Sequence, residues 1–137
     1  MYVVTIDQRR SRSSADRVPA LIDALANIPT AAAFERTAGD EVQGLLDDPA
    51  AVRSALLVAL REGDWHCGVG AGDVDDESYS SGTRAGRGDA YLAARDAVDA
   101  AKGLPGSVAI RVSGDPGSRD DRGSATAWAA DCEAVWA

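Results

Sequence analysis

The stretch AFERTAGDEVQGLL, from Ala33 to Leu46, decides the fold because it predicts a β-hairpin in the first half of the chain. Two short runs containing apolar residues flank Ala38-Gly39-Asp40, where a glycine beside an acidic residue favours a tight turn. Strand-like and helix-like patterns alternate on both sides of this hairpin.

On the N-terminal side, the run from Tyr2 to Ile6 predicts a β-strand that ends at Asp7, followed by a polar loop. Asp16 as N-cap and Pro19 in the first turn then predict a helix. The apolar residues of this helix recur with helical spacing and are Val18, Leu21, Ile22, Leu25 and Ile28.

On the C-terminal side, a second helix is predicted between the N-cap Asp48, with Pro49 in its first position, and the stop signal Gly63. Its apolar stripe is Val52, Leu56, Leu57 and Leu60. A strand is expected over 65–70, because Trp65-His66-Cys67-Gly68-Val69-Gly70 alternates apolar with small or polar residues.

The rest of the chain predicts a polar loop over 71–88, a helix over 89–102, a strand over 107–113 and, after a polar connector, a last helix from Ser124. The helix over 89–102 is expected to gather one set of residues near a single face: Tyr91, Leu92, Arg95, Val98 and Ala101. The last helix, with Trp128, Cys132, Val135 and Trp136, reaches Ala137 without a stop signal. It is expected to dock on the core or to lead into a C-terminal module beyond Ala137.

This order of elements predicts an α+β fold in a single domain of 137 residues, with a core over 1–113 and a connector and helix over 114–137. The first six elements match a ferredoxin-like split βαββαβ arrangement, in which helices pack on one face of an antiparallel sheet. The later strand and helix are additions to that arrangement.

Charge and hydropathy exclude several classes of function. A net charge of -8 repels nucleic acid and anionic membranes, so direct nucleic-acid binding by this segment is not expected. No apolar run approaches the ~20 residues of a membrane span and no signal peptide is visible, so a cytoplasmic protein is expected.

Cys67 and Cys132 stand outside any CxxC or Cys/His cluster and are expected to be buried free thiols. His66 has no second ligand at metal-binding spacing, so an ordinary surface or edge residue is expected.

Three carboxylates are candidate metal ligands. Asp7 ends the first strand, and Asp40 and Glu41 lie in the hairpin turn, which is beside that strand in a split βαββαβ fold. Hard oxygen ligands gathered at one sheet edge bind Mg²⁺ or Mn²⁺, which in turn holds nucleotide phosphates. The alternative is that these carboxylates only satisfy the backbone of the turn.

A basic loop is a candidate phosphate site. Arg9, Arg10 and Arg12 precede a helix N-terminus, against the negative charge of the whole molecule. Guanidinium groups and free backbone N–H groups placed in this way hold phosphate. The alternative is a solvated surface loop.

Four segments resemble class III nucleotidyl cyclases, in the same order along the chain. Arg36-Thr37-Ala38-Gly39-Asp40-Glu41 resembles the cyclase hairpin motif Lys/Arg-Thr-x-Gly-Asp and is similar to the Gly-Gly-Asp-Glu hairpin of diguanylate cyclases. Thr5-Ile6-Asp7 resembles the first cyclase strand with its metal-binding Asp, residues 67–74 the glycine-rich strand, and Ala93-Ala94-Arg95 the helix segment whose Arg meets the triphosphate. This resemblance implies a palm-type fold, a nucleotide, Mg²⁺ or Mn²⁺, a catalytic Arg95 and a homodimeric site.

Two segments are similar to the bacterial SatD-like proteins. They are residues 7–12, Asp-Gln-Arg-Arg-Ser-Arg, and residues 39–46, Gly-Asp-Glu-Val-Gln-Gly-Leu-Leu. Longer members of that family continue into a helix-turn-helix, so the similarity implies the sensor part of a transcriptional regulator.

Three positions depart from the cyclase pattern. Tyr91 stands where cyclases carry an Asn, and Arg84 stands about where a purine-selecting Asp would be. Arg36 stands at the position of the base-reading Lys, which a planar guanidinium does not replace directly. These departures favour a regulatory domain that binds a nucleotide or a phosphorylated small molecule through a metal, without catalysis. The alternatives are an active metal-dependent nucleotidyl cyclase or transferase, with Arg95 stabilising the transferring phosphate, and a non-catalytic interaction scaffold.

Overall fold

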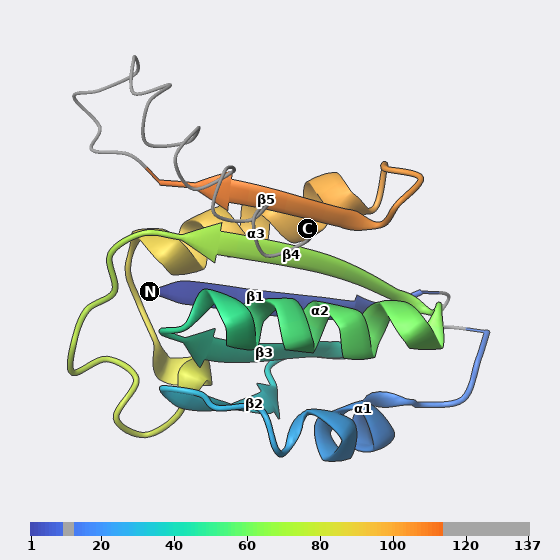
Figure 1. Ribbon diagram of the computed structural model, residues 1–137, viewed down its shortest axis with the longest axis horizontal. Helices are drawn as coiled ribbons and strands as arrows, with labels where there is room; N and C mark the ends of the chain where they lie inside the picture. Colours follow the sequence, from blue (N-terminus) through green and yellow to red (C-terminus); the bar gives the residue numbers. More distant parts are fainter. Residues whose placement is uncertain (10–12, 114–137) are drawn as a thin grey trace.

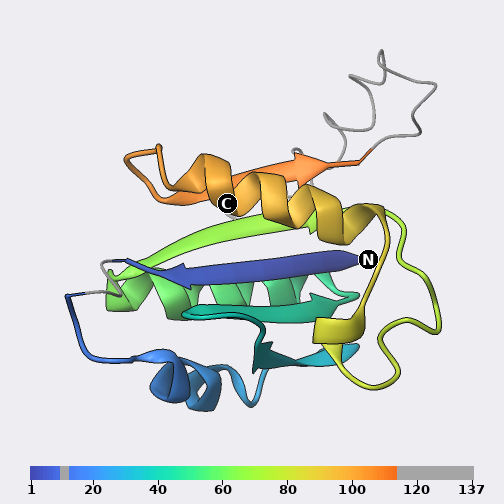
Figure 2. The same ribbon diagram turned by 180° about the vertical axis from the view of Figure 1, so that it is seen from behind.

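The fold is α+β, built on a single five-stranded sheet (Figures 1 and 2). A computed structural model describes residues 1–9 and 13–113, so the predicted connector and helix over 114–137, with Cys132, lie outside the described residues. The elements in chain order are β1 (Tyr2–Gln8), α1 (Val18–Leu25), β2 (Ala32–Arg36), β3 (Glu41–Leu46), α2 (Pro49–Glu62), β4 (Trp65–Ala71), the 3₁₀ turn η1 (Thr83–Ala85), α3 (Asp89–Ala101) and β5 (Val108–Val112).

The strands follow the order β2-β3-β1-β4-β5 across the sheet. The first four pair antiparallel, as expected, while β5 pairs parallel to β4, which makes the whole sheet mixed. Parallel neighbours require a crossover connection, and α3 supplies it between β4 and β5. The central strand is therefore β1, with β3 and β4 on its two sides.

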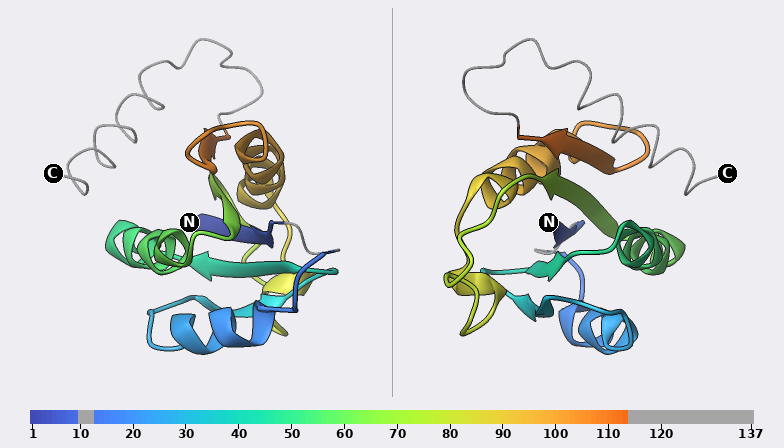
Figure 3. Two further views of the ribbon diagram at one scale, coloured as in Figure 1. Left: turned by 90° about the vertical axis from the view of Figure 1, so that its right-hand side faces the viewer. Right: turned by 60° about the vertical axis from the view of Figure 1, so that its left-hand side comes forward.

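The helices cover both faces of the sheet (Figure 3). Helices α1 and α2 pack on one face against alternate residues of the central strands, including Val4, Ile6 and Val69. Helix α3 packs on the other face, where Val3 and Leu45 contact its first turns. Strand residues alternate between the faces with a period of two, so β1 and β3 contribute to both clusters.

Local signals account for the position of α2. Asp48 Oδ1 accepts a hydrogen bond from Ala50 N at 2.9 Å, Pro49 begins the helix, and Gly63 ends it in the left-handed conformation at φ 79°. All three roles were predicted from sequence. In α1 the N-cap position is Arg17 rather than Asp16, but Asp16 Oδ1 still accepts from Val18 N at 3.1 Å.

Helix α3 lies unusually close to β4 because its contact face is alanine and the strand offers glycine. A Cβ on Gly70 would lie 2.2 Å from both Ala90 O and Ala94 N, and one on Gly68 would lie 2.3 Å from Val98 N. Glycine at these positions lets the two backbones approach closely. The crossover helix is therefore fixed against the sheet along most of its length.

The predicted face of this helix was wrong in two residues. Leu92 is 66% exposed and Arg95 is also exposed, while alanines 90, 94, 97 and 101 form the buried stripe together with Tyr91 and Val98. The physical reason is the glycine strand, which accepts only small side chains and so selects the alanine stripe over the larger apolar residue. Arg95 is thereby left free to face a cavity.

Candidate functional site

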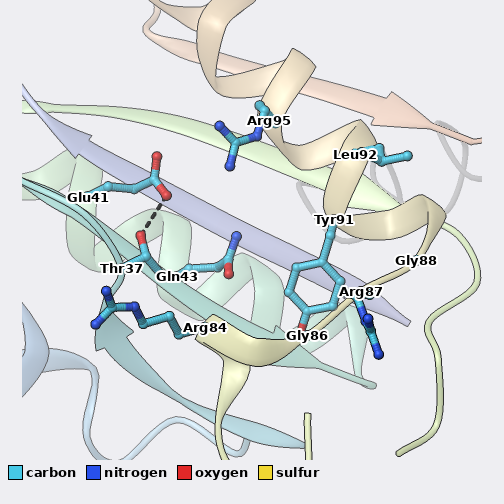
Figure 4. Close-up of a pocket in the computed structure, with 10 residues that line it drawn as sticks. All are labelled: Thr37, Glu41, Gln43, Arg84, Gly86, Arg87, Gly88, Tyr91, Leu92 and Arg95. Atoms are coloured by element: carbon cyan, nitrogen blue, oxygen red, sulfur yellow. Dashed lines mark hydrogen bonds between the residues drawn. The ribbon is translucent and has the colours of Figure 1, made fainter. Parts of the chain in front are cut away.

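A cavity of about 420 Å³ lies between the β2–β3 hairpin, the loop before α3 and the first turns of α3 (Figure 4). We call it the arginine pocket. Its lining comprises Thr37, Glu41, Gln43, Arg84, Gly86, Arg87, Gly88, Tyr91, Leu92 and Arg95. The pocket lies between the hairpin that resembles the cyclase motif and the helix that carries Arg95. These two segments are far apart in the sequence.

Three arginines give the pocket its charge. Arg84, Arg87 and Arg95 are exposed, and within residues 1–9 and 13–113 their guanidinium groups make no hydrogen bond or ion pair. Figure 4 shows Arg95 directed toward Glu41, the single carboxylate of the lining, while Arg84 and Arg87 come from the loop on the other side. A locally positive cavity on a protein of net charge -8 favours an anionic ligand.

The floor of the pocket is a chain of polar side chains. Tyr91 Oη lies 3.2 Å from Thr83 Oγ1, which lies 3.4 Å from Gln43 Oε1. Gln43 Nε2 in turn donates to Thr5 Oγ1 at 3.4 Å. Thr83 is fully buried, and burial raises the pKa of Tyr91, which the hydrogen bond with Thr83 partly offsets. Gly86 makes room for the ring, since a Cβ there would lie 2.0 Å from Tyr91 Oη.

The predicted metal carboxylates do meet at one end of the sheet. Asp7 is paired directly with Glu41 across the β1–β3 ladder, and Gln8 N donates to Asp40 O at 3.3 Å. Two of the three predicted ligands already have a partner: Lys102 Nζ lies 3.0 Å from Asp7 Oδ2, and Thr37 Oγ1 donates to Glu41 Oε1 at 2.6 Å. Across the part of the chain that the structure describes, no three His, Cys, Asp or Glu side chains are grouped to hold a metal ion. A divalent ion at Asp7 would have to displace an ammonium group, so the donor set fits a metal poorly.

Two of the predicted phosphate-binding arginines, Arg9 and Arg36, lie outside the pocket lining. Arg36 donates to Gly39 O at 2.6 Å and to Asp16 Oδ2 at 2.5 Å, and this bond with Arg36 lowers the pKa of Asp16. Arg9 N donates to Asp64 O at 2.8 Å, and its buried Nε has no partner in the described part of the chain. Arg10 and Arg12 lie outside the described residues. Of the predicted basic site residues that the structure describes, which are Arg9, Arg36 and Arg95, only Arg95 lines the pocket.

Sequence reasoning missed Arg87, Gln43 and Thr83 and treated Arg84 only as a departure from the cyclase pattern. A signal was present in Gly82-Thr83-Arg84-Ala85-Gly86-Arg87-Gly88, where two arginines alternate with glycines just ahead of a helix. Glycine permits close backbone approach and arginine binds phosphate. This pattern therefore indicates a candidate phosphate site, as the arginines of the earlier loop did.

Two titratable residues of β4 have shifted pKa values, and one of them, His66, lies opposite Asp7. His66 is paired with Asp7 across the β1–β4 ladder, its Nδ1 is buried without a hydrogen-bond partner among the described residues, and burial lowers its pKa. Cys67 is a buried free thiol, as predicted, and burial raises its pKa to about 12. A thiol of that pKa is protonated at neutral pH and unreactive.

No family model, curated protein or solved structure matches this chain. None of the described helices combines the length and the apolar character needed to cross a membrane.

Proposed function

We propose that this chain is a regulatory domain that binds a nucleotide or another phosphorylated small molecule in the arginine pocket without converting it. The observation that carries the proposal is the set of three guanidinium groups, free of partners in the described residues, around one cavity of an acidic protein. Guanidinium groups bind phosphate oxygens through paired, charge-assisted hydrogen bonds.

The fold supports a cyclase-like origin for this pocket. The order β4-β1-β3-β2, its antiparallel pairing and the packing of α1 and α2 on one face are what a ferredoxin-like palm requires. The pocket lies between the hairpin and the helix of Arg95, the segments on which the resemblance to cyclases rests. A SatD-like regulatory role fits binding in such a pocket.

The lining supports binding without cyclisation. Tyr91 uses its hydroxyl in the buried polar floor, and Arg36 is engaged with Gly39 O and Asp16 rather than available to a base. Arg84 adds positive charge where the cyclase pattern carries a purine-selecting acid. These features retain phosphate recognition and remove base recognition of the cyclase type.

A second candidate is an active metal-dependent nucleotidyl cyclase or transferase. The direct pairing of Asp7 with Glu41, and the orientation of Arg95 toward Glu41, favour it (Figure 4). It requires Mg²⁺ or Mn²⁺ at Asp7, Asp40 and Glu41 and a homodimer that completes the site.

The test is isothermal titration of nucleoside mono-, di- and triphosphates and cyclic nucleotides into wild type and Arg95→Gln, after a thermal-shift screen. Loss of one charge-assisted contact should weaken binding by roughly 10–100-fold. Arg53→Gln is the matched control, since Arg53 is an exposed arginine of α2 outside the pocket. Failure of every phosphorylated ligand to bind, or equal losses in the two variants, would contradict the proposal.

A turnover assay separates the two candidates. Wild type incubated with nucleoside triphosphates and Mn²⁺ should form no product above an Asp40→Asn control. Product that depends on Asp40 would establish the second candidate and overturn the non-catalytic role.

A further inference from the structure

The acidic end of β1 carries a cation supplied by the protein itself. Lys102 Nζ lies 3.0 Å from Asp7 Oδ2 and 3.6 Å from Asp99 Oδ1. The ion pair is partly shielded, since the side chain of Asp7 is 24% exposed and that of Lys102 is 46% exposed. Its position is the end of the sheet where Asp7 meets Glu41, one strand away from the hairpin turn.

The fold holds Lys102 at this place. It is the C-cap residue of α3, and its backbone N donates to Val98 O at 3.3 Å. Val98 lies against Gly68 of β4, so the last turn of α3 is fixed to the strand next to β1. A cation at a helix C-terminus is also favoured by the helix dipole.

The choice of residue type is informative. Lys102 is the only lysine in the chain, whose other fixed side-chain cations are all arginine. Arginine is a planar fork, whereas the lysine ammonium is a compact, strongly hydrated point charge. The residue beside Asp7 is therefore the protein cation that most resembles a metal ion.

The neighbouring carboxylate of Glu41 also has a partner. Glu41 accepts the hydroxyl of Thr37 at 2.6 Å, and the described residues offer no group of three ligands. A metal between Asp7 and Glu41 would meet the ammonium of Lys102 at Asp7. It would also lie on the side toward which Arg95 is directed, since Arg95 points toward Glu41 (Figure 4). Both positive charges oppose it.

We propose that Lys102 occupies the place that a divalent metal would take beside Asp7, so that the arginine pocket binds its phosphorylated ligand without a metal ion. The replacement of a metal by Lys102 concerns Asp7 alone, whereas metal-free ligand binding rests on the proposed function. In this proposal the ammonium group of Lys102 stands beside Asp7, where a cyclase site would hold a metal ion.

The test uses Mn²⁺ alone as the probe, with free Mn²⁺ followed by electron paramagnetic resonance. Wild type should bind no Mn²⁺ through Asp7, so wild type and Asp7→Asn should titrate alike. Lys102→Met should bind Mn²⁺ roughly tenfold or more tighter than wild type, because a positive charge is removed from beside the carboxylate. Adding Asp7→Asn to Lys102→Met should abolish that gain.

Lys102→Arg is the matched control, since it retains the charge and should exclude Mn²⁺ as wild type does. Asp7-dependent Mn²⁺ binding by wild type would overturn the inference, and so would a Lys102→Met protein that gains none. Circular dichroism of each variant shows that it is folded before it is titrated.

A second arm titrates the same nucleoside mono-, di- and triphosphates and cyclic nucleotides in the presence of Mg²⁺ and in the presence of a chelator. Equal affinity supports metal-free binding, and a chelator-sensitive affinity overturns it. The Mn²⁺ arm contains no phosphorylated ligand, so failure of the proposed function would appear in the ligand titrations and leave the result at Asp7 readable.

Discussion

The two faces of the sheet pack against their helices in different ways. The face under α1 and α2 is filled by large apolar side chains, among them Leu21, Leu56 and Trp65. The face under α3 brings alanine against glycine and leaves the remaining space to Thr5, Gln43 and the pocket. Large side chains stabilise the first face and close backbone approach stabilises the second. The cavity beside α1, about 230 Å³, is lined mainly by apolar residues, whereas the larger arginine pocket lies on the α3 side.

The sharpest test of this contrast substitutes two adjacent residues of β4 that face opposite ways. Gly70→Ala should destabilise the protein by about 4 kcal/mol, because the new methyl group meets backbone atoms of α3 at 2.2 Å. Val69→Ala, on the α2 face, should cost about 2 kcal/mol by leaving a cavity. Urea unfolding measures both, and a Gly70→Ala protein as stable as wild type would refute the close approach of α3.

A smaller effect is expected in the polar floor of the α3 face. Thr83→Val removes the partner of Tyr91 Oη in a buried position and should cost about 1–2 kcal/mol in urea unfolding. The pKa of Tyr91 should rise further, because the hydrogen bond between Tyr91 and Thr83 partly offsets the rise caused by burial. Ultraviolet titration follows this phenol, with Tyr91→Phe as the control that identifies its signal. An unchanged titration curve would contradict the network.

The charge of the pocket can be tested at its one carboxylate. Glu41→Gln should tighten binding of a phosphorylated ligand several-fold, since it removes a like charge worth about 1 kcal/mol. If Glu41 held a metal that bridged to phosphate, the same substitution would weaken binding. Calorimetric titration distinguishes the two by the sign of the change, and Glu62→Gln, outside the pocket, is the control.

The smallest effect concerns the single histidine of the chain, which lies beside Asp7. His66 has a pKa below 6.5 in the folded protein because of burial, with Arg9 and Lys102 adding to the shift and Asp7 opposing it. Between the folded pKa and 6.5 the unfolded chain binds more protons. Stability should therefore rise with pH through this window, and His66→Gln should flatten that part of the profile. One imidazole NMR signal gives the folded pKa directly, and a value at or above 6.5 would contradict the prediction.

The fold was predictable where short local signals decide it. Asp48, Pro49 and Gly63 bounded α2 correctly, and the turn around Gly39 gave the hairpin that brings Glu41 beside Asp7. The face of α3 was not predictable from apolar periodicity, because the strand opposite it is glycine and favours alanine over Leu92. Packing between elements decided that choice, and hydrophobicity did not.

The site was predictable to a lesser degree. Asp7 is paired with Glu41, and Glu41 lines the pocket together with Arg95, but Arg84 and Arg87 come from a loop whose path local sequence does not determine. The pairing of Lys102 with Asp7 joins residues at opposite ends of the described chain. Contacts of that kind depend on the completed topology and leave no mark on local sequence.

The central position of β1 has a consequence for the synthesis of the protein. Tyr2 pairs with Leu46 of β3 on one side and with Ala71 of β4 on the other. Strand β1 is therefore made before either of its two neighbours. At ~5–20 residues per second, translation takes several seconds to reach β4. Until then the nascent chain displays an apolar β-strand with at least one open edge, and with two before β3 is made. Such a segment associates readily between chains. The ribosome-bound form of this protein should therefore be a stronger substrate for chaperones than the finished domain.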